Sequence, residues 1–323
     1  MVLKILLGYS GGSLDHMIAS VYNSCMGIRG FPGERVVSAE EIRRLWFEYS
    51  TFNPEEFVIV LYNGRVYGIA FTSAYGVYGR LWLCIDPELP RYYQLETIHY
   101  ILSWAHYVFS SKRVSVVKIS CGYEYSTLYN LIRSVLGFVV EKTSVTLMEY
   151  RGTPVETVRV DRDFIIRKAT LDDVEGIVNV WNNTFRKYSW FEEWRVEDAI
   201  KWYSTRKLIV YVAVDKETNT IAGYVDGEIR KGVDGETYGY VYTLAVHPEK
   251  QGHGLGRSLL NTMIKELSSY NPKGIYLDAL HGLEDYYSRQ GFKIKRRYRI
   301  LRTYTDSLPK HGAPYILRQD KYY

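Results

Sequence analysis

One stretch, residues 241–260, constrains the fold of this chain more than any other, and it reads VYTLAVHPEKQGHGLGRSLL. It opens with β-branched and aromatic residues in which Tyr242, Leu244 and Val246 alternate with smaller ones, and this pattern predicts a buried strand. Pro248 ends the strand, and apolar residues later recur at helical spacing. Between them lie Gly252, Gly254 and Gly256, and the helical positions are Leu255, Leu259, Leu260, Met263, Ile264 and Leu267.

The order of strand, glycine loop and helix predicts an anion site. A helix begins with backbone N–H groups that have no partner within the helix, and these groups attract phosphate. Glycines let the backbone approach the anion closely. The spacing excludes both the G-x-G-x-x-G of dinucleotide folds and the Gly-Lys-Ser or Gly-Lys-Thr of ATP-binding loops. The alternative is a tight turn whose glycines serve geometry alone.

The pattern Gln251-x-x-Gly254-x-Gly256, directly after a strand ending Leu-Ala-Val-His-Pro, resembles the acyl-coenzyme A loop of the GNAT N-acetyltransferase superfamily. The resemblance implies an α/β (α+β) fold, in which helices flank a mixed sheet. It further implies that the cofactor is acetyl-CoA or another acyl-CoA. It also implies that the central strand holds the pantetheine arm while loop amides hold the phosphates. The cofactor-binding residues implied are Leu244, Ala245, Val246, Gln251, Gly252, His253, Gly254, Leu255, Gly256 and Arg257.

The two halves of the chain repeat one order of predicted elements, which indicates an internal duplication. The Gly-Phe pairs at 137–138 and 291–292 lie 154 residues apart, and the hairpin glycines Gly68 and Gly223 lie 155 apart. Pro87 and Pro248, each following a strand, lie 161 apart. We therefore expect two tandem GNAT-like domains, residues 1–150 and 162–323, joined by a linker at 151–161.

The first copy departs from the loop pattern. By the proline alignment, Pro90, Tyr93 and Leu95 stand where the second copy has Gln251, Gly254 and Gly256, which removes a backbone donor and adds bulk. The first copy is therefore expected to be degenerate and non-catalytic. It would act as a docking partner in an internal pseudo-dimer, and shaping the acceptor pocket is the alternative role.

Direct acyl transfer to an amine needs a proton acceptor for the amine and a proton donor for the leaving thiolate. The motif Tyr287-x-x-x-Gly291-Phe292 is family-like, and the resemblance implies that Tyr287 is the acid; a packing role is the alternative. Asp278 stands where some members that act on protein N-termini carry a glutamate base. A carboxylate on an apolar strand favours function, and a solvent-facing strand end is the alternative.

Acceptor choice in the superfamily usually rests with the segment between the first two helices, here residues 182–195. Its aromatic rings and carboxylates suit a cationic amine, and packing against the first copy is the alternative. We expect Trp190, Glu192 and Glu193 from this segment, with Tyr240 of the central strand, to bind the acceptor.

Composition and charge limit the partners and the location that the chain can have. The 323 residues carry a net charge of +5, which suits an anionic cofactor and does not require nucleic acid. The late basic run from Lys293 to Arg302 is most simply a solvated edge strand, with polyanion binding as a minority interpretation. No apolar window reaches the ~20 residues of a membrane span, and the chain is expected to be cytoplasmic.

Metal ligands are not expected. Cys25, Cys84 and Cys121 lack metal or disulfide spacing and are expected to be buried thiols. The sequence as a whole predicts an acetyl-CoA-dependent N-acetyltransferase that acts on a primary amine of a small molecule or protein. The alternative is a non-catalytic acyl-CoA-binding sensor or scaffold.

Overall fold

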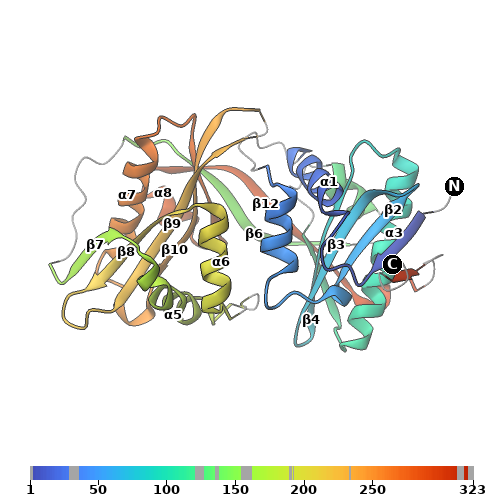
Figure 1. The fold of residues 1–323 in the computed structure, drawn as a ribbon, viewed down its shortest axis with the longest axis horizontal. Helices are drawn as coiled ribbons and strands as arrows, with labels where there is room; N and C mark the ends of the chain where they lie inside the picture. Colours follow the sequence, from blue (N-terminus) through green and yellow to red (C-terminus); the bar gives the residue numbers. More distant parts are fainter. Residues whose placement is uncertain are drawn as a thin grey trace. The chain divides into compact units, whose positions relative to one another are not determined.

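The computed structural model describes residues 3–28, 36–120, 127–134, 138–153, 162–188, 191, 193–232, 234–310 and 316–318. Contacts divide the chain into two compact units. Unit 1 comprises Met1–Ser144 with Arg297–Tyr323, and unit 2 comprises Val145–Arg296. Figure 1 labels the elements.

Unit 1 is a mixed sheet with helices on both faces. Its strand order is β13-β1-β2-β3-β4-β5, with the last residues of β12 beyond β5. The strands are β1 (Leu3–Leu7), β2 (Phe57–Tyr62), β3 (Arg65–Tyr75), β4 (Tyr78–Ile85), β5 (Val116–Ser120), β13 (Ile316–Arg318) and the unit 1 parts of β6 (Val139–Tyr150) and β12 (Phe292–Tyr304). The helices are α1 (Asp15–Ile28), α2 (Ala39–Ile42), the π-turn η1 (Arg43–Phe47), the short 3-10 turns η2 (Pro54–Glu56) and η5 (Thr305–Ser307), α3 (Arg91–Ser111) and α4 (Thr127–Ser134).

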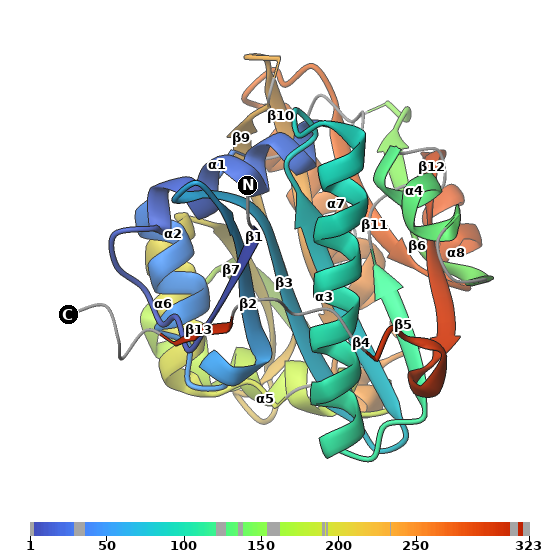
Figure 2. The ribbon, with the colours of Figure 1, turned by 90° about the vertical axis from the view of Figure 1, so that its right-hand side faces the viewer.

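The apolar side chains of α3 recur at helical spacing, so one face of this helix packs on the sheet. Figure 2 shows α3 lying across β3 and β4. Ile98, Ile101 and Phe109 are fully buried there. The opposite face of the sheet is covered by α1 and α2, where the aromatic rings of Trp46, Phe71 and others gather.

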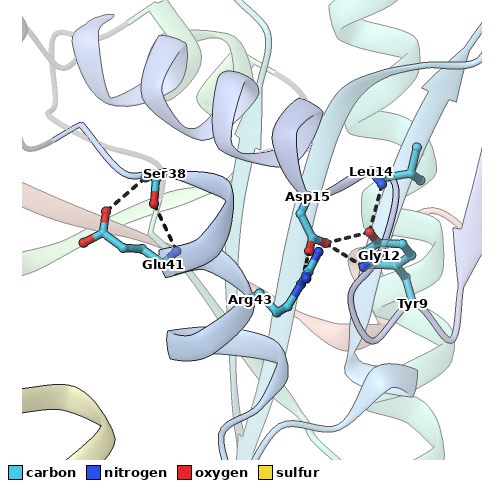
Figure 3. A network of polar contacts seen from close by, with 7 residues as sticks. All are labelled: Tyr9, Gly12, Leu14, Asp15, Ser38, Glu41 and Arg43. Atoms are coloured by element: carbon cyan, nitrogen blue, oxygen red, sulfur yellow. Dashed lines mark hydrogen bonds and ion pairs between the residues drawn. The ribbon is translucent and has the colours of Figure 1, made fainter. Parts of the chain in front are cut away.

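A polar network fixes the start of α1 (Figure 3). Asp15 is 1% exposed, and its Oδ1 accepts hydrogen bonds from the Tyr9 hydroxyl at 2.6 Å and the Gly12 N–H at 3.0 Å. The Arg43 Nε donates to Oδ2 at 2.7 Å. Ser38 and Glu41 form a capping box at the start of α2. The capping box satisfies a backbone donor at the start of α2, and the bonds of Asp15 tie the loop before α1 to Arg43.

Unit 2 is a second mixed sheet, with strand order β6-β11-β10-β9-β8-β7. Its strands are the unit 2 part of β6, β7 (Phe164–Lys168), β8 (Ile209–Asp215), β9 (Ile221–Lys231), β10 (Thr237–Val246), β11 (Ile275–Leu280) and the start of β12. Its helices are η3 (Leu171–Asp173), α5 (Val174–Phe185), α6 (Val196–Arg206), η4 (Pro248–Lys250), α7 (Leu255–Ser268) and α8 (Glu284–Ser288).

Helix α7 covers one face of the unit 2 sheet, and α5 and α6 cover the other (Figure 1). The predicted spacing in α7 is confirmed, because the six apolar positions are all at most 1% exposed. The core on this face therefore fixes the start of α7, directly after the glycine loop.

The compact units differ from the predicted domain boundaries at two strands. Strand β6 passes from unit 1 into unit 2 after Ser144, and β12 passes back after Arg296. Residues 145–149 of β6 pair with β11, so a strand at the end of the first half completes the sheet of the second. Leu301–Tyr304 pair with β5, so the end of the basic run, at Leu301 and Arg302, is not the free edge that we expected.

The cysteine prediction was wrong for two residues. Cys25 and Cys84 form a disulfide between α1 and β4, because tertiary packing brings together two positions that are 59 residues apart in sequence. Cys121 lies outside the described residues, as do Gly137 and most of the predicted linker. Within the described part of the chain, no helix is long and apolar enough to cross a bilayer.

Candidate functional site

The central feature of unit 2 is a gap between two parallel strands. Strands β10 and β11 pair only from Gly239 opposite Ile275 to Val241 opposite Leu277, although β10 continues to Val246. The separation coincides with a bulge, because the register between β10 and β9 shifts between Val241 and Thr243. Beyond this bulge the two strands diverge.

The bulge changes the simple alternation that the sequence predicts. Tyr240 before the bulge and Tyr242 within it point to the side of α6, where Tyr242 accepts a hydrogen bond from Arg206. After it, Leu244 and Val246 pack with the core beneath α7, and Ala245 packs with the core beneath α5. Tyr242 and Leu244 therefore lie on opposite faces, because the extra residue shifts the period of two by one.

The glycine loop follows with backbone conformations that other residues avoid. Gly252 has φ +90° and Gly254 has φ +74°, in the left-handed region that favours glycine. Space is tight at Gly256, since a Cβ atom there would lie 3.0 Å from the Tyr286 hydroxyl. The amide side chain of Gln251 and the Thr184 hydroxyl both donate to the Val246 carbonyl, which fixes the loop to the strand end.

A cavity of about 660 Å³ runs from the gap to the glycine loop. This volume lies within the range of about 300–1,000 Å³ that is usual for small-molecule sites. The start of α7 opens into the cavity, so amides without an intrahelical partner face it. The lining residues are Val145, Trp181, Thr184, Phe185, Lys187, Tyr188, Tyr242, Thr243, Leu244, Val246, Lys250, Gln251, Gly252, Gly254, Leu255, Gly256, Arg257, Asp278, Leu280, Leu283, Tyr286 and Tyr287.

Most of the residues implied for the cofactor line this cavity, but two do not. Ala245 is 1% exposed and packs beneath α5. His253 is exposed at the loop tip, with its ring 6.2 Å from that of Phe164. Three cations line the cavity: Lys250 is paired with Asp215 at 2.7 Å, Lys187 follows α5, and Arg257 lies in the first turn of α7.

Tyr287 and Asp278 both line the cavity. Burial raises the pKa of the Tyr287 hydroxyl, so this phenol keeps its proton at neutral pH. Asp278 is exposed to the cavity, and its Oδ2 accepts a 2.6 Å hydrogen bond from the Tyr240 hydroxyl. Tyr240 itself is buried, with the Arg230 guanidinium 3.8 Å from its ring centre, and it contacts two residues that line the cavity, Asp278 and Tyr242.

The structure describes only some of the residues that we expect to bind the acceptor. Trp190 and Glu192 lie outside the described residues. Glu193 is exposed and is not among the residues that line the cavity. The predicted segment does reach the site through Tyr188, which lines the cavity with Trp181 of α5.

Sequence reasoning missed several lining residues. Tyr242 and Thr243 are brought to the cavity by the bulge, which no sequence pattern marks. Val145 comes from β6, a strand that we assigned to the first copy. Aromatic residues at helical spacing on α5, Trp181 and Phe185, were the signal available for that wall of the site.

Unit 1 differs from unit 2 at each of these features. Strands β4 and β5 stay paired as far as Trp82 opposite Ser120, two residues further than the aligned strands of unit 2, and β3 and β4 pair without a register shift. Trp82, the counterpart of Thr243 in the proline alignment, packs among Tyr22, Trp46 and Phe71. Pro90 is the N-cap residue of α3, and the side-chain amide of Gln94 donates hydrogen bonds to the carbonyls of Pro87 and Leu89.

Residues 175–292 match a model described as the acetyltransferase (GNAT) family. A methionine sulfoximine and methionine sulfone acetyltransferase of Salmonella typhimurium is 32% identical over 105 residues, and an L-amino acid N-acyltransferase of Escherichia coli is 30% identical over 105 residues. Each match covers 31% of this chain and 61% of the relative. The chain thus spans about three fifths of the length of these relatives.

Solved structures extend the fold comparison to both units. A tandem GNAT protein from the clavulanic acid biosynthesis pathway has a TM-score of 0.68 at 14% identity, covering 94% of this chain and 99% of that one. A GCN5-related N-acetyltransferase from Sphaerobacter thermophilus has a TM-score of 0.61 at 16% identity, covering 96% and 97%. The expected mixed α/β fold is confirmed. Residues 175–292 therefore resemble the acetyltransferase (GNAT) family, in a chain with the fold of tandem GNAT proteins.

Proposed function

We propose that unit 2 transfers an acetyl group from acetyl-CoA directly to a primary amine of a small molecule or protein. The observation that carries this proposal is the single cavity that joins the gap between β10 and β11 to the start of α7. A site of this form accepts an extended ligand with an anionic end at the loop and a reactive end in the gap. The amino acid N-acyltransferases among the relatives support a small amine as the acceptor.

The residues present fit acetyl-CoA. The amides of residues 252–257 suit a diphosphate, because they lie at a helix start where glycine leaves the backbone open. Arg257 adds a planar cation that suits phosphate. The β10 residues from Leu244 to Val246 offer main-chain groups along the gap. When bound, the cofactor supplies an acyl thioester.

Two side chains then provide proton transfer. Asp278 is the carboxylate in the cavity wall, and in this proposal it accepts the proton that the ammonium group of the acceptor loses. The neutral amine attacks the thioester carbonyl, Tyr287 donates a proton to the leaving thiolate, and the second proton lost by the nitrogen as the amide forms restores the Tyr287 hydroxyl. The raised pKa of Tyr287 suits this role, because the donor must hold its proton until the thiolate forms. Tyr240 orients Asp278 through their hydrogen bond.

Tyr188, Trp181 and Tyr242 form an aromatic wall that suits the apolar part of an amine near Asp278. Trp190, Glu192 and Glu193 stay predictions for this end of the site.

We propose that unit 1 does not bind acetyl-CoA. Its strands β4 and β5 stay paired two residues further than their counterparts in unit 2, and Trp82 packs among aromatic rings at the position that Thr243 opens in unit 2. Pro90 and Gln94 close the turn that would have to hold the phosphates.

The test measures thiol release and acceptor mass shift with acetyl-CoA across amino acids, arylalkylamines, polyamines and peptides. We expect Tyr287→Phe to lower kcat by about 10²–10⁴-fold, with acetyl-CoA affinity unchanged by calorimetry. Tyr270→Phe is the matched control, because Tyr270 is 52% exposed at the end of α7. Binding without turnover for any acceptor would favour an acyl-CoA sensor, and turnover retained in Tyr287→Phe would remove Tyr287 from the mechanism.

A further inference from the structure

We infer that Asp226 of β9 is a positioning residue that holds the bulge of β10 open at the acyl site. The inference rests on the proposed function, because it concerns the geometry of that same site. Asp226 is 1% exposed, so it does not touch a ligand in the cavity. It acts through Thr243, whose N–H donates to the Asp226 Oδ1 at 2.8 Å.

The bulge leaves the Thr243 N–H dependent on a side-chain acceptor, which is the Asp226 carboxylate. Tyr242 is the extra residue between the pairs Val241–Gly227 and Thr243–Asp226, and an extra residue disrupts the ladder of backbone hydrogen bonds. A buried N–H group without an acceptor is costly, so a bulge in a sheet core persists only where its donors are satisfied. The carboxylate opposite Thr243 supplies that acceptor.

Asp226 is itself held in place from α6. The Tyr203 hydroxyl donates to its Oδ2 at 3.3 Å, so the carboxylate accepts hydrogen bonds on both oxygens. Helix α6 and strand β9 thereby fix one rotamer of this side chain. A carboxylate with both oxygens engaged is a rigid support for the backbone that it contacts.

The bulge matters because it sets the direction of the following backbone. It places Leu244 on the opposite face from Tyr242, and it lies where β10 leaves β11. Thr243 and Leu244 both line the cavity. Catalysis by backbone groups depends on their placement to within a fraction of an ångström, so the support under Thr243 affects the reaction more than cofactor affinity.

The experiment compares Asp226→Asn, which keeps an oxygen acceptor, with Asp226→Leu, which has a similar shape and no acceptor. We expect Asp226→Leu to lower kcat at least about 30-fold, with the KM for acetyl-CoA within about threefold, since the loop and α7 are untouched. Asp226→Asn should stay within about threefold of the unmodified protein in both constants.

Asp173→Leu is the matched control for loss of a buried carboxylate. Asp173 is 7% exposed, accepts two hydrogen bonds from Arg167, and lies at the start of α5 away from the bulge. This variant should lose thermal stability while kcat per folded molecule is kept. Equal losses in Asp226→Leu and Asp173→Leu, or in Asp226→Asn and Asp226→Leu, would overturn the positioning role.

A second measurement separates this inference from the proposed function. Hydrogen exchange at the Thr243 amide needs no turnover. We expect slow exchange in the unmodified protein and in Asp226→Asn, and at least about tenfold faster exchange in Asp226→Leu. If no amine is acetylated but these exchange rates follow, the proposed function fails and the support of the bulge stands. Unchanged exchange in Asp226→Leu refutes the inference whether or not the protein is an enzyme.

Discussion

Replacing Asp226 by asparagine is expected to stabilise unit 2 at neutral pH and not at acid pH. Burial raises the pKa of this carboxyl from 3.8 to about 6, against hydrogen bonds from Thr243 that lower it. Because the folded-state pKa is above the unfolded one, the protonated form favours folding. Its stabilising effect is complete below pH 3.8 and is lost as the pH rises through 6. Asparagine does not titrate and keeps the acceptor for the Thr243 N–H.

The magnitude follows from the pKa difference. A difference of about two pKa units, at about 1.4 kcal/mol per unit, corresponds to about 3 kcal/mol. The unfolding free energy of Asp226→Asn, relative to that of the unmodified protein, should therefore rise by about this amount between pH 4 and pH 7. Urea unfolding at these pH values measures the change, and hydrogen exchange over β9 and β10 assigns it to unit 2. Asp172→Asn, on an exposed side chain, is the control and should give little difference. A pH-independent difference for Asp226→Asn would refute the reasoning.

Three further predictions concern the loop, the core and unit 1. Gly256→Ala should weaken acetyl-CoA binding in calorimetry, because its Cβ would lie 3.0 Å from the Tyr286 hydroxyl. Adding Tyr286→Phe should restore part of the affinity, and no recovery would mean that Tyr286 is not the obstacle. Leu259→Ala, at a position with 0% exposure, should cost about 2–5 kcal/mol and lower the Tm, and a smaller loss would contradict its place in the core. Calorimetry should give one acetyl-CoA per chain, whereas two would contradict the closed turn at Pro90.

Local patterns predicted the elements of the fold well. An Asn-Gly pair is a strong local signal for a tight hairpin turn, and Asn63 and Gly64 form such a turn with positive φ at both residues. The apolar spacing of α7 and the strand that ends before Pro248 are found as predicted, and the motif from Ser38 to Glu41 forms a capping box. Each of these features depends on residues that are close in sequence, so the sequence reports them directly.

Long-range pairing was not predictable in the same way. Nothing in residues 139–150 indicates that the end of β6 pairs with β11 and brings Val145 to the cavity. The disulfide between Cys25 and Cys84 likewise depends on the packing of α1 against the sheet. Both relations depend on which surfaces meet, and no single segment carries that information.

The sequence by itself determined the strand, the glycine loop and the helix of the site, because backbone conformation and hydrogen-bonding capacity are properties of neighbouring residues. It also marked Tyr287 and Asp278, which the fold places in the wall of one cavity. Only the tertiary structure decided where β10 leaves β11 and that Asp226 supports the bulge there. A bulge is a relation between two strands, and its amide finds an acceptor only when the sheet and α6 have assembled around it.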